Sequence, residues 1–221
     1  NEIVDHARLY GIDKKTATER GKALLAALES WLDTVLAPLD PLEKLHRAAS
    51  DPDAGSQARA LLLNLLAGHG FVTREQAGIE HLPKEMRPFL RKIGVTFGAL
   101  DVFAPALLKP APRQLLNMLG VDRRPLQEAM LPVIAETKKL PSGYRAAGTQ
   151  AIRIDLAEKI LRAAHETRAK AQSKDRRRKF VLDYALPISI GLEEDNISRL
   201  LGNAGFRVQR AQPLPEGQFG P

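Results

Sequence analysis

The sequence contains no cysteine, so disulfide bonds and thiolate metal sites are excluded. Aromatic residues are scarce at 5%, while hydrophobic residues make up 44% and include many Ala and Leu. This balance favours helices packed on helices over a β-sandwich. No apolar run approaches the roughly 20 residues of a membrane span, and no signal peptide is recognisable. We therefore expect a mainly helical, cytoplasmic protein with no membrane partner.

Sequence patterns of a catalytic centre are also lacking. The five histidines are scattered and form no H-E-x-x-H motif, so we predict no metal site. Gly143–Gly148 has the glycine spacing of a phosphate loop, but Thr149 and Gln150 stand where lysine and a hydroxyl residue are required. The acidic residues 193–195 fit the first turn of a helix. We expect no catalytic residue and no cofactor here, although an enzyme site assembled from distant residues stays an alternative.

Hydrophobic residues at helical spacing predict a multi-helical first lobe over residues 1–137. The predicted helices run from Asp13 or Thr16 to about Ala37, from Ala54 to Ala67, from a capping box at Thr73–Gln76, from Pro83 through Leu90, from Pro112 to Leu119, and from Leu126 to Lys139. In the first helix an apolar stripe is formed by Leu24, Leu25, Leu28, Trp31, Leu32 and Val35.

Turn residues and polarity predict a linker at residues 138–148, followed by a small α+β lobe at 149–211 and a flexible tail at 212–221. The predicted elements of this lobe are a strand at 151–154, a helix from Asp155 to Gln172, a strand at 180–186, a helix at 193–201 and an extended segment at 206–210. The fold class we predict is thus mainly α, with a small α+β C-terminal lobe.

Residues 93–113 combine three prolines, two glycines and two phenylalanines with otherwise helix-forming residues. A helix cannot continue through Pro105, Pro110 and Pro112, because each lacks a backbone donor and restricts the residue before it. The apolar residues of the segment still favour burial. We predict an irregular but packed junction between helices.

Basic residues gather in one short run of the chain, whose net charge is +7. Residues 170–179 hold six of the 33 basic residues and one of the 26 acidic residues, so the rest carries 27 basic and 25 acidic residues. The basic residues of the run are Lys170, Lys174, Arg176, Arg177, Arg178 and Lys179. Such a patch suits contact with nucleic-acid phosphates, independent of base sequence. A solvated helix end and a protein-docking surface are the alternatives.

Four further cations lie near the proline-rich segment. The prolines fix the direction of Lys109 and Arg113, so both are candidates for phosphate contact near a helix start. The alternative is that Lys109 extends over buried leucines. Arg91 and Lys92 flank the same segment and could enlarge the patch.

Three stretches resemble the C-terminal region of a family of alphaproteobacterial helicases, which are similar to the mitochondrial degradosome RNA helicase of superfamily two. Residues 93–115, IGVTFGALDVFAPALLKPAPRQL, resemble the family's GVRFG and P-LLKP motifs. Residues 144–159 resemble its G-x-x-A-V-R-x-D-x-L-E stretch, and residues 189–208 its SLLG and LG-Y/F-R-V stretch. Trp31 and Leu32 match an earlier WL position, so the resemblance covers roughly residues 15 to 213.

The resemblance implies that the chain is the non-catalytic C-terminal accessory region of an ATP-dependent RNA or DNA helicase. ATP and magnesium would then bind only in the parent's motor domains, on which this region would pack. Single-stranded or duplex RNA or DNA, the upstream motor domains and a ribonuclease are the implied partners. The alternative is a protein-interaction scaffold that docks a nuclease or another acidic partner without binding nucleic acid.

Overall fold

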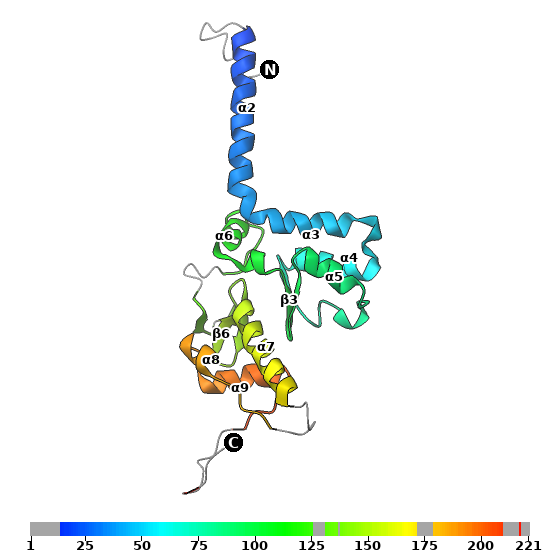
Figure 1. Cartoon of the computed structure of the whole chain (residues 1–221). Coiled ribbons are helices and arrows are strands. Elements are labelled where there is room, and N and C mark those ends of the chain that lie inside the picture. The colour runs from blue at the N-terminus through cyan, green and yellow to red at the C-terminus, as the bar shows by residue number, and fades with distance from the viewer. Residues whose placement is uncertain (1–13, 126–130, 137, 172–178, 210–216, 218–221) are drawn as a thin grey trace. The chain divides into compact units, whose positions relative to one another are not determined.

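The computed structural model of the chain describes residues 14–125, 131–136, 138–171, 179–209 and 217. The fold is mainly α with a small α+β part, as predicted (Figure 1). Two compact units are present, Asn1–Asp40 and Pro41–Pro221, and each is described by itself.

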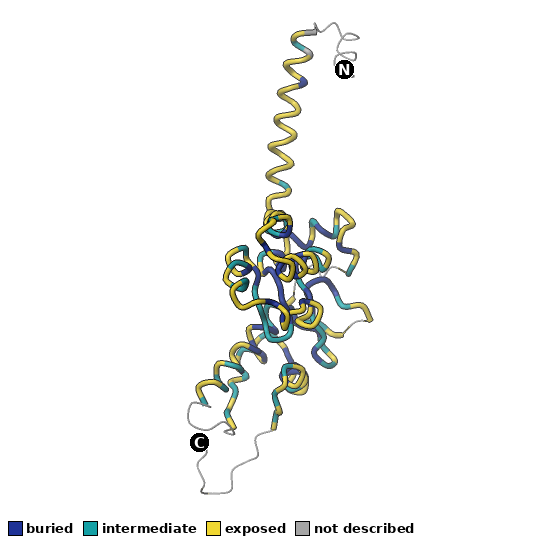
Figure 2. The backbone as a smooth tube through the Cα atoms, turned by 90° about the vertical axis from the view of Figure 1, so that its right-hand side faces the viewer, coloured by how far each residue is buried: buried dark blue, intermediate teal, exposed yellow. Residues whose placement is uncertain are grey.

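The first unit contains the long helix α2 (Lys14–Leu36) and the 3-10 turn η1 (Ala37–Leu39). The predicted helix is present, with its apolar stripe in the predicted positions. The stripe is not buried, since Leu24 is 63% and Trp31 58% exposed. Figure 2 shows α2 as exposed along nearly its whole length.

The second unit contains the remaining elements. Its helices are α3 (Asp40–Ser50), α4 (Ser56–Ala67), α5 (Met86–Lys92), α6 (Pro110–Met118), α7 (Ile154–Ala171), α8 (Ala185–Ser189) and α9 (Glu194–Asn203). Its 3-10 turns are η2 (Pro52–Ala54), η3 (Ile79–His81) and η4 (Pro105–Leu108). Its strands are β1 (Phe71–Thr73), β2 (Thr96–Phe97), β3 (Asp101–Phe103), β4 (Val133–Ala135), β5 (Tyr144–Ala147) and β6 (Gln150–Arg153).

The proline-rich segment folds as a hairpin followed by a short turn. No helix runs through it, but it is more regular than predicted, because β2 and β3 pair in the antiparallel sheet β1-β3-β2. Val95, Val102 and Phe103 are buried. Pro105 then begins η4 and Pro110 begins α6, as suits residues that need no backbone donor at a helix start.

A second antiparallel sheet, in the order β4-β6-β5, lies in the α+β part. β6 and α7 fall where the sequence predicts a strand and a helix. The prediction of a linker at 138–148 is wrong, because this segment contains β5. Ser142 and Tyr144 within it are buried. Gly148, in the left-handed region at φ 71°, makes the turn from β5 to β6, so Gly143–Gly148 is a strand and its turn.

Three other predictions are wrong. The segment 126–139, predicted as a helix, contains the strand β4 instead, where the β-branched residues Val133 and Ile134 pair with β6. Residues 126–130 and 137 of that segment lie outside the described residues. Residues 180–184 form no strand, and the apolar positions from Leu182 to Leu186 face a core cluster instead. The capping box at Thr73–Gln76 is made in both directions but encloses a turn.

One buried carboxylate joins the first sheet to α7. Glu158 is 4% exposed and accepts hydrogen bonds from the backbone N–H groups of Ala99 (2.5 Å), Leu100 (2.8 Å) and Asp101 (2.8 Å). Gly98 allows this close approach, because a Cβ atom there would lie 2.2 Å from the Glu158 Cδ. The turn between β2 and β3 is therefore fixed onto a helix nearly 60 residues away.

A second ionic contact and an apolar cluster reinforce this connection. The Asp101 carboxylate, 2% exposed, accepts hydrogen bonds from Arg145 of β5 at 2.6 and 2.7 Å. Phe103 and Leu108 share a buried cluster with Ile154 at the start of α7. Residues on both sides of the predicted linker thus form one compact unit.

Replacing Glu158 by Gln should destabilise the fold. The amide nitrogen cannot accept a hydrogen bond, so at least one turn N–H loses its buried partner, at a cost of about 2–3 kcal/mol in the free energy of unfolding. Urea unfolding measures this loss. The control is Glu166→Gln, on the exposed side of the same helix, with an expected change within about 0.5 kcal/mol. Equal stability of the two variants would contradict the role of Glu158.

Candidate nucleic-acid interface

Arg113, predicted to contact phosphate, is instead a buried structural residue. Its side chain is 1% exposed, and its Nε donates to the Leu107 carbonyl at 2.6 Å. One terminal nitrogen donates to the Ser142 hydroxyl at 3.0 Å and lies 3.3 Å from Asp122; the other donates to the His69 carbonyl. The guanidinium thus has no surface left for a nucleic acid, and we remove Arg113 from the candidate interface.

Asp122 is the centre of this buried cluster. Its carboxylate pairs with Arg124 at 2.8 Å and accepts a hydrogen bond from the Ser142 hydroxyl. Burial by itself would raise the pKa of Asp122, but the hydrogen bonds from Arg124 and Ser142 outweigh burial and hold the pKa well below its usual range. A carboxylate so strongly stabilised as an anion is a poor general base, so we assign the cluster a structural role.

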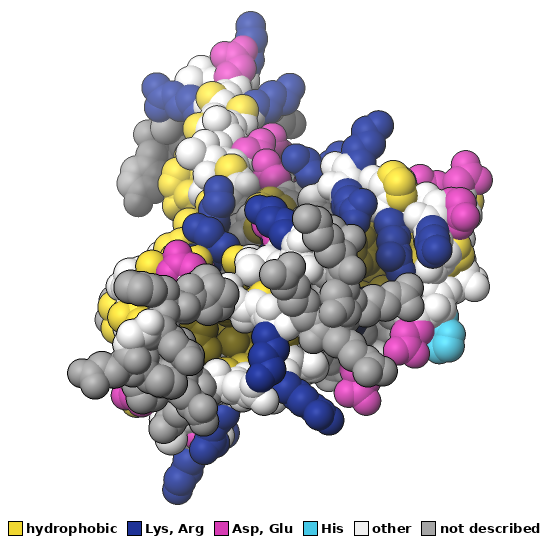
Figure 3. All heavy atoms as spheres, turned by 60° about the horizontal axis from the view of Figure 1, so that its bottom comes forward, with side chains coloured by type: hydrophobic (Ala, Val, Ile, Leu, Met, Phe, Trp, Pro, Cys, Tyr) yellow, Lys and Arg dark blue, Asp and Glu magenta, His cyan; other side chains and the backbone are white. Residues whose placement is uncertain are grey.

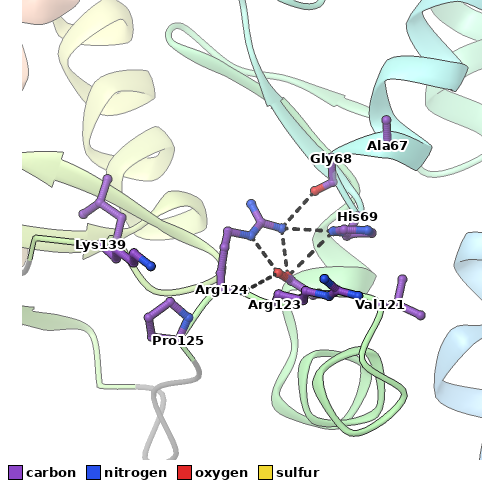
Figure 4. A pocket seen from close by; sticks show the side chains of 10 residues that line it. Ala67, Gly68, His69, Val121, Arg123, Arg124, Pro125 and Lys139 are labelled. Carbon is purple, nitrogen blue, oxygen red and sulfur yellow. Dashed lines mark hydrogen bonds and ion pairs between the residues drawn. The ribbon is translucent and has the colours of Figure 1, made fainter.

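Two other members of the cluster also have shifted pKa values. Burial lowers the pKa of Arg113 to about 10, against the opposing effect of Asp122, so Arg113 stays cationic at neutral pH. Burial also lowers the pKa of His69, and the cations of Arg124 and Arg113 add to this effect while Asp122 opposes it. Figure 4 shows the Arg124 guanidinium directed at His69 and at the carbonyl of Gly68, to which it donates at 3.2 Å.

The cluster lies at the wall of a pocket of about 610 Å³. Arg123, Arg124 and Lys139 are among its lining residues. Arg124 is already occupied by Asp122, and Lys139 has a partner of its own. Most of the charge at this pocket is therefore used within the protein.

Lys109 is exposed, at the residue before α6. Leu107 and Leu108 beside it are buried. The start of α6 offers few backbone donors to an anion, because Pro110 and Pro112 have no N–H group. Any phosphate contact here would therefore rest on the Lys109 ammonium alone.

Arg91 and Lys92 are exposed in the last turn of α5. Residues 84–92 carry four basic residues and one acidic residue, an excess that the sequence analysis did not single out. Figure 3 shows several Lys and Arg side chains close together on the right-hand side of the view, where Figure 1 places α3, α4 and α5. The sequence of α5 and the residues before it thus carries an excess of positive charge, with Arg91 and Lys92 exposed at the end of the helix.

The run at 170–179 is only partly described. α7 ends at Ala171, and Lys179 is exposed. Lys174, Arg176, Arg177 and Arg178 lie outside the described residues. The run follows the C-terminus of a helix, where cations are favoured by the helix dipole, so the phosphate-contact and helix-end interpretations both stay open.

A second pocket, of about 690 Å³, brings together residues of four elements. It is lined by Arg91, Gly94, Val95, Thr96, Phe97, Pro105, Ala106 and Arg162. Of the predicted site residues that the structure describes, only Arg91 lines it. Arg162 lies on α7, far along the sequence, and its place among ordinary helix-surface residues gave no signal that it would join this site.

Comparison with protein-family models, with curated proteins and with solved structures returned no match for this chain. Within the described ranges, no helix has the combined length and hydrophobicity that crossing a membrane requires. Those same ranges contain no group of three or more His, Cys, Asp or Glu side chains placed to hold a metal ion. The candidate interface therefore rests on the geometry of the basic residues.

Replacing Asp122 by Asn should destabilise the protein by about 3 kcal/mol at neutral pH, because buried Arg113 loses its counter-charge. The folded-state pKa of Asp122 is lower than the unfolded value of about 3.9, so the unfolded state binds the proton more readily. The stabilisation is therefore complete above about pH 4 and is lost as the pH falls below it.

Urea unfolding between pH 3 and pH 7 measures this dependence, with Asp33→Asn on the exposed surface of α2 as the control. The wild-type protein should lose part of its advantage over Asp122→Asn between about pH 4 and pH 3. An advantage that is independent of pH would contradict the ionic role of Asp122.

Proposed function

We propose that this chain is a non-catalytic accessory region that binds the backbone of a nucleic acid. The observation that carries the proposal is the basic surface at the end of α5, where exposed Arg91 and Lys92 adjoin a pocket that also holds Arg162. None of the described residues that line that pocket is acidic. Unneutralised cations on one surface favour a polyanion, whose binding releases condensed counterions.

The wider interface that we propose adds the predicted cations outside the pocket. Lys109 and Lys179 are exposed and available for contact. Lys174 and Arg176–Arg178 belong to the proposal on the sequence alone. Because phosphate contacts carry no base information, binding through these residues would be independent of sequence.

The resemblance to helicase C-terminal regions extends the proposal to a parent protein. The parent's motor domains would bind ATP and magnesium and perform hydrolysis in the cytoplasm, and this region would pack on them while it contacts the RNA or DNA. The exposed apolar stripe of α2 supports such packing, since Leu24, Leu28 and Trp31 are each about half exposed or more. Large apolar surfaces of this kind mark protein–protein contact sites.

The same stripe also favours a second candidate function. A protein-interaction scaffold would dock a nuclease or another acidic partner and would need no nucleic acid. The two functions differ in their response to RNA and DNA, so direct binding separates them.

Fluorescence anisotropy with labelled single-stranded RNA, single-stranded DNA and duplex, over a salt series, tests the proposal. We expect affinity to fall steeply with salt. In Arg91→Glu/Lys92→Glu, the log–log slope for single strands should decrease in magnitude by about 1.4, since each phosphate contact contributes about 0.7. Reversal of Arg176, Arg177 and Arg178 should have a larger effect.

The matched control is Arg199→Glu/Arg207→Glu, which changes the same charge at two exposed positions of the C-terminal part. Its salt slope should stay close to that of the wild-type chain. Flat anisotropy at low salt with all three nucleic acids would contradict the proposal and would favour the scaffold.

A further inference from the structure

The pocket beside Arg91 is lined by both apolar and charged residues. Val95, Phe97, Pro105 and Ala106 supply carbon surface, whereas Arg91 on α5 and Arg162 on α7 supply the charge. Its volume of about 690 Å³ is within the range of about 300–1,000 Å³ that is usual for small-molecule sites. A ligand that fits it would combine a flat apolar part with an anionic part.

The two guanidinium groups are free to bind such a ligand. Within the described part of the chain, neither Arg91 nor Arg162 makes an ion pair or a hydrogen bond. The Arg91 Cζ lies 5.9 Å from the centroid of the Phe97 ring, a loose cation–π distance. By contrast, the buried Arg113 and the half-buried Arg145 are both paired with aspartates.

Phe97 is held in place but is not enclosed. The ring packs against the first core cluster and is half-buried, so part of it stays accessible from the pocket. The neighbouring Thr96 hydroxyl makes no hydrogen bond to any described residue and can serve a ligand.

The hairpin that carries Phe97 is fixed by Glu158 and by the Asp101–Arg145 ion pair. Glu158 and Arg162 are one turn apart on α7, so the contact that fixes the hairpin also sets its position relative to Arg162. A site held rigid before binding loses little entropy when the ligand binds.

We propose that this pocket receives one unpaired nucleotide of a single-stranded nucleic acid. The base stacks on Phe97 and on the plane of the Arg91 guanidinium, and the adjoining phosphate pairs with Arg162. Bases stack on aromatic rings and on arginine in this manner in single-strand-binding proteins. A duplex cannot use the pocket, because its bases are stacked inside the helix. The inference rests on the proposed function, which by itself requires only backbone contact.

The test compares two single strands of equal length and charge, a labelled oligothymidine 12-mer and a 12-mer of abasic residues, by anisotropy with the whole chain. Stacking of one base contributes about 1–3 kcal/mol. The oligothymidine should therefore bind about 5-fold to 160-fold more tightly than the abasic strand. Phe97→Leu, which keeps a core-filling side chain, should abolish this difference and leave the salt slope unchanged.

Two exposed positions provide variants that do not depend on the core. Arg91→Gln should reduce the preference for bases. Because Arg91→Gln and Arg162→Gln each remove one cation, each should also lower the salt slope for both strands by about 0.7. Arg199→Gln on α9 is the control and should change neither quantity. Thermal unfolding checks that Phe97→Leu is folded; if it is not, Arg91→Gln and Arg162→Gln decide the question.

The outcomes separate the inference from the proposed function. Equal, salt-dependent binding of both strands would overturn the proposed role of the pocket in binding a base and would leave the proposed backbone binding intact. A preference for oligothymidine that persists in Phe97→Leu and Arg91→Gln would place base stacking elsewhere on the protein. That result would also overturn the proposed role of the pocket. If neither the oligothymidine, the abasic strand nor a duplex binds, both the pocket inference and the proposed function are overturned.

Discussion

The Glu158 carboxylate is the contact on which the arrangement of the second unit depends. It accepts three backbone hydrogen bonds from the turn between β2 and β3, although turn and helix are almost 60 residues apart. A buried charge is stable only where such donors compensate for lost hydration. The geometry permits this because Gly98 has no side chain. Once the hairpin is fixed on α7, Arg91, Phe97 and Arg162 come to line one pocket.

Burial divides the charged residues of the second unit into two groups with different roles. Arg113, Asp122 and Glu158 are buried and fully engaged with partners inside the protein, so they maintain the fold. Arg91 and Arg162 are exposed and unpaired among the described residues, so their charge is available to a ligand. Both groups contain arginine, and residue type alone therefore does not distinguish a structural cation from a binding one.

Local patterns predicted the helices α2, α4, α5, α6, α7 and α9 and part of the α+β region. The helix predicted from Asp155 is α7, and the strand predicted before it is β6. The capping box at Thr73 is present as a hydrogen-bonded turn. Long-range contacts were not predictable. Nothing near Arg113 in the sequence shows that Asp122 and Ser142 would enclose it. Residues 133–135 form the strand β4 because they pair with β6, which lies further along the sequence. Of the pocket, the sequence indicated only Arg91.

Photochemical cross-linking of a single-stranded RNA to the whole chain, with the cross-linked peptides mapped by mass spectrometry, shows where the strand lies on the protein. We predict cross-links on the peptide that contains Phe97 and on peptides from the basic run at 170–179. Competition by unlabelled single strand should remove them, and duplex should compete only for the basic run. Cross-links confined to α2, or none at all, would contradict a nucleic-acid interface in the second unit.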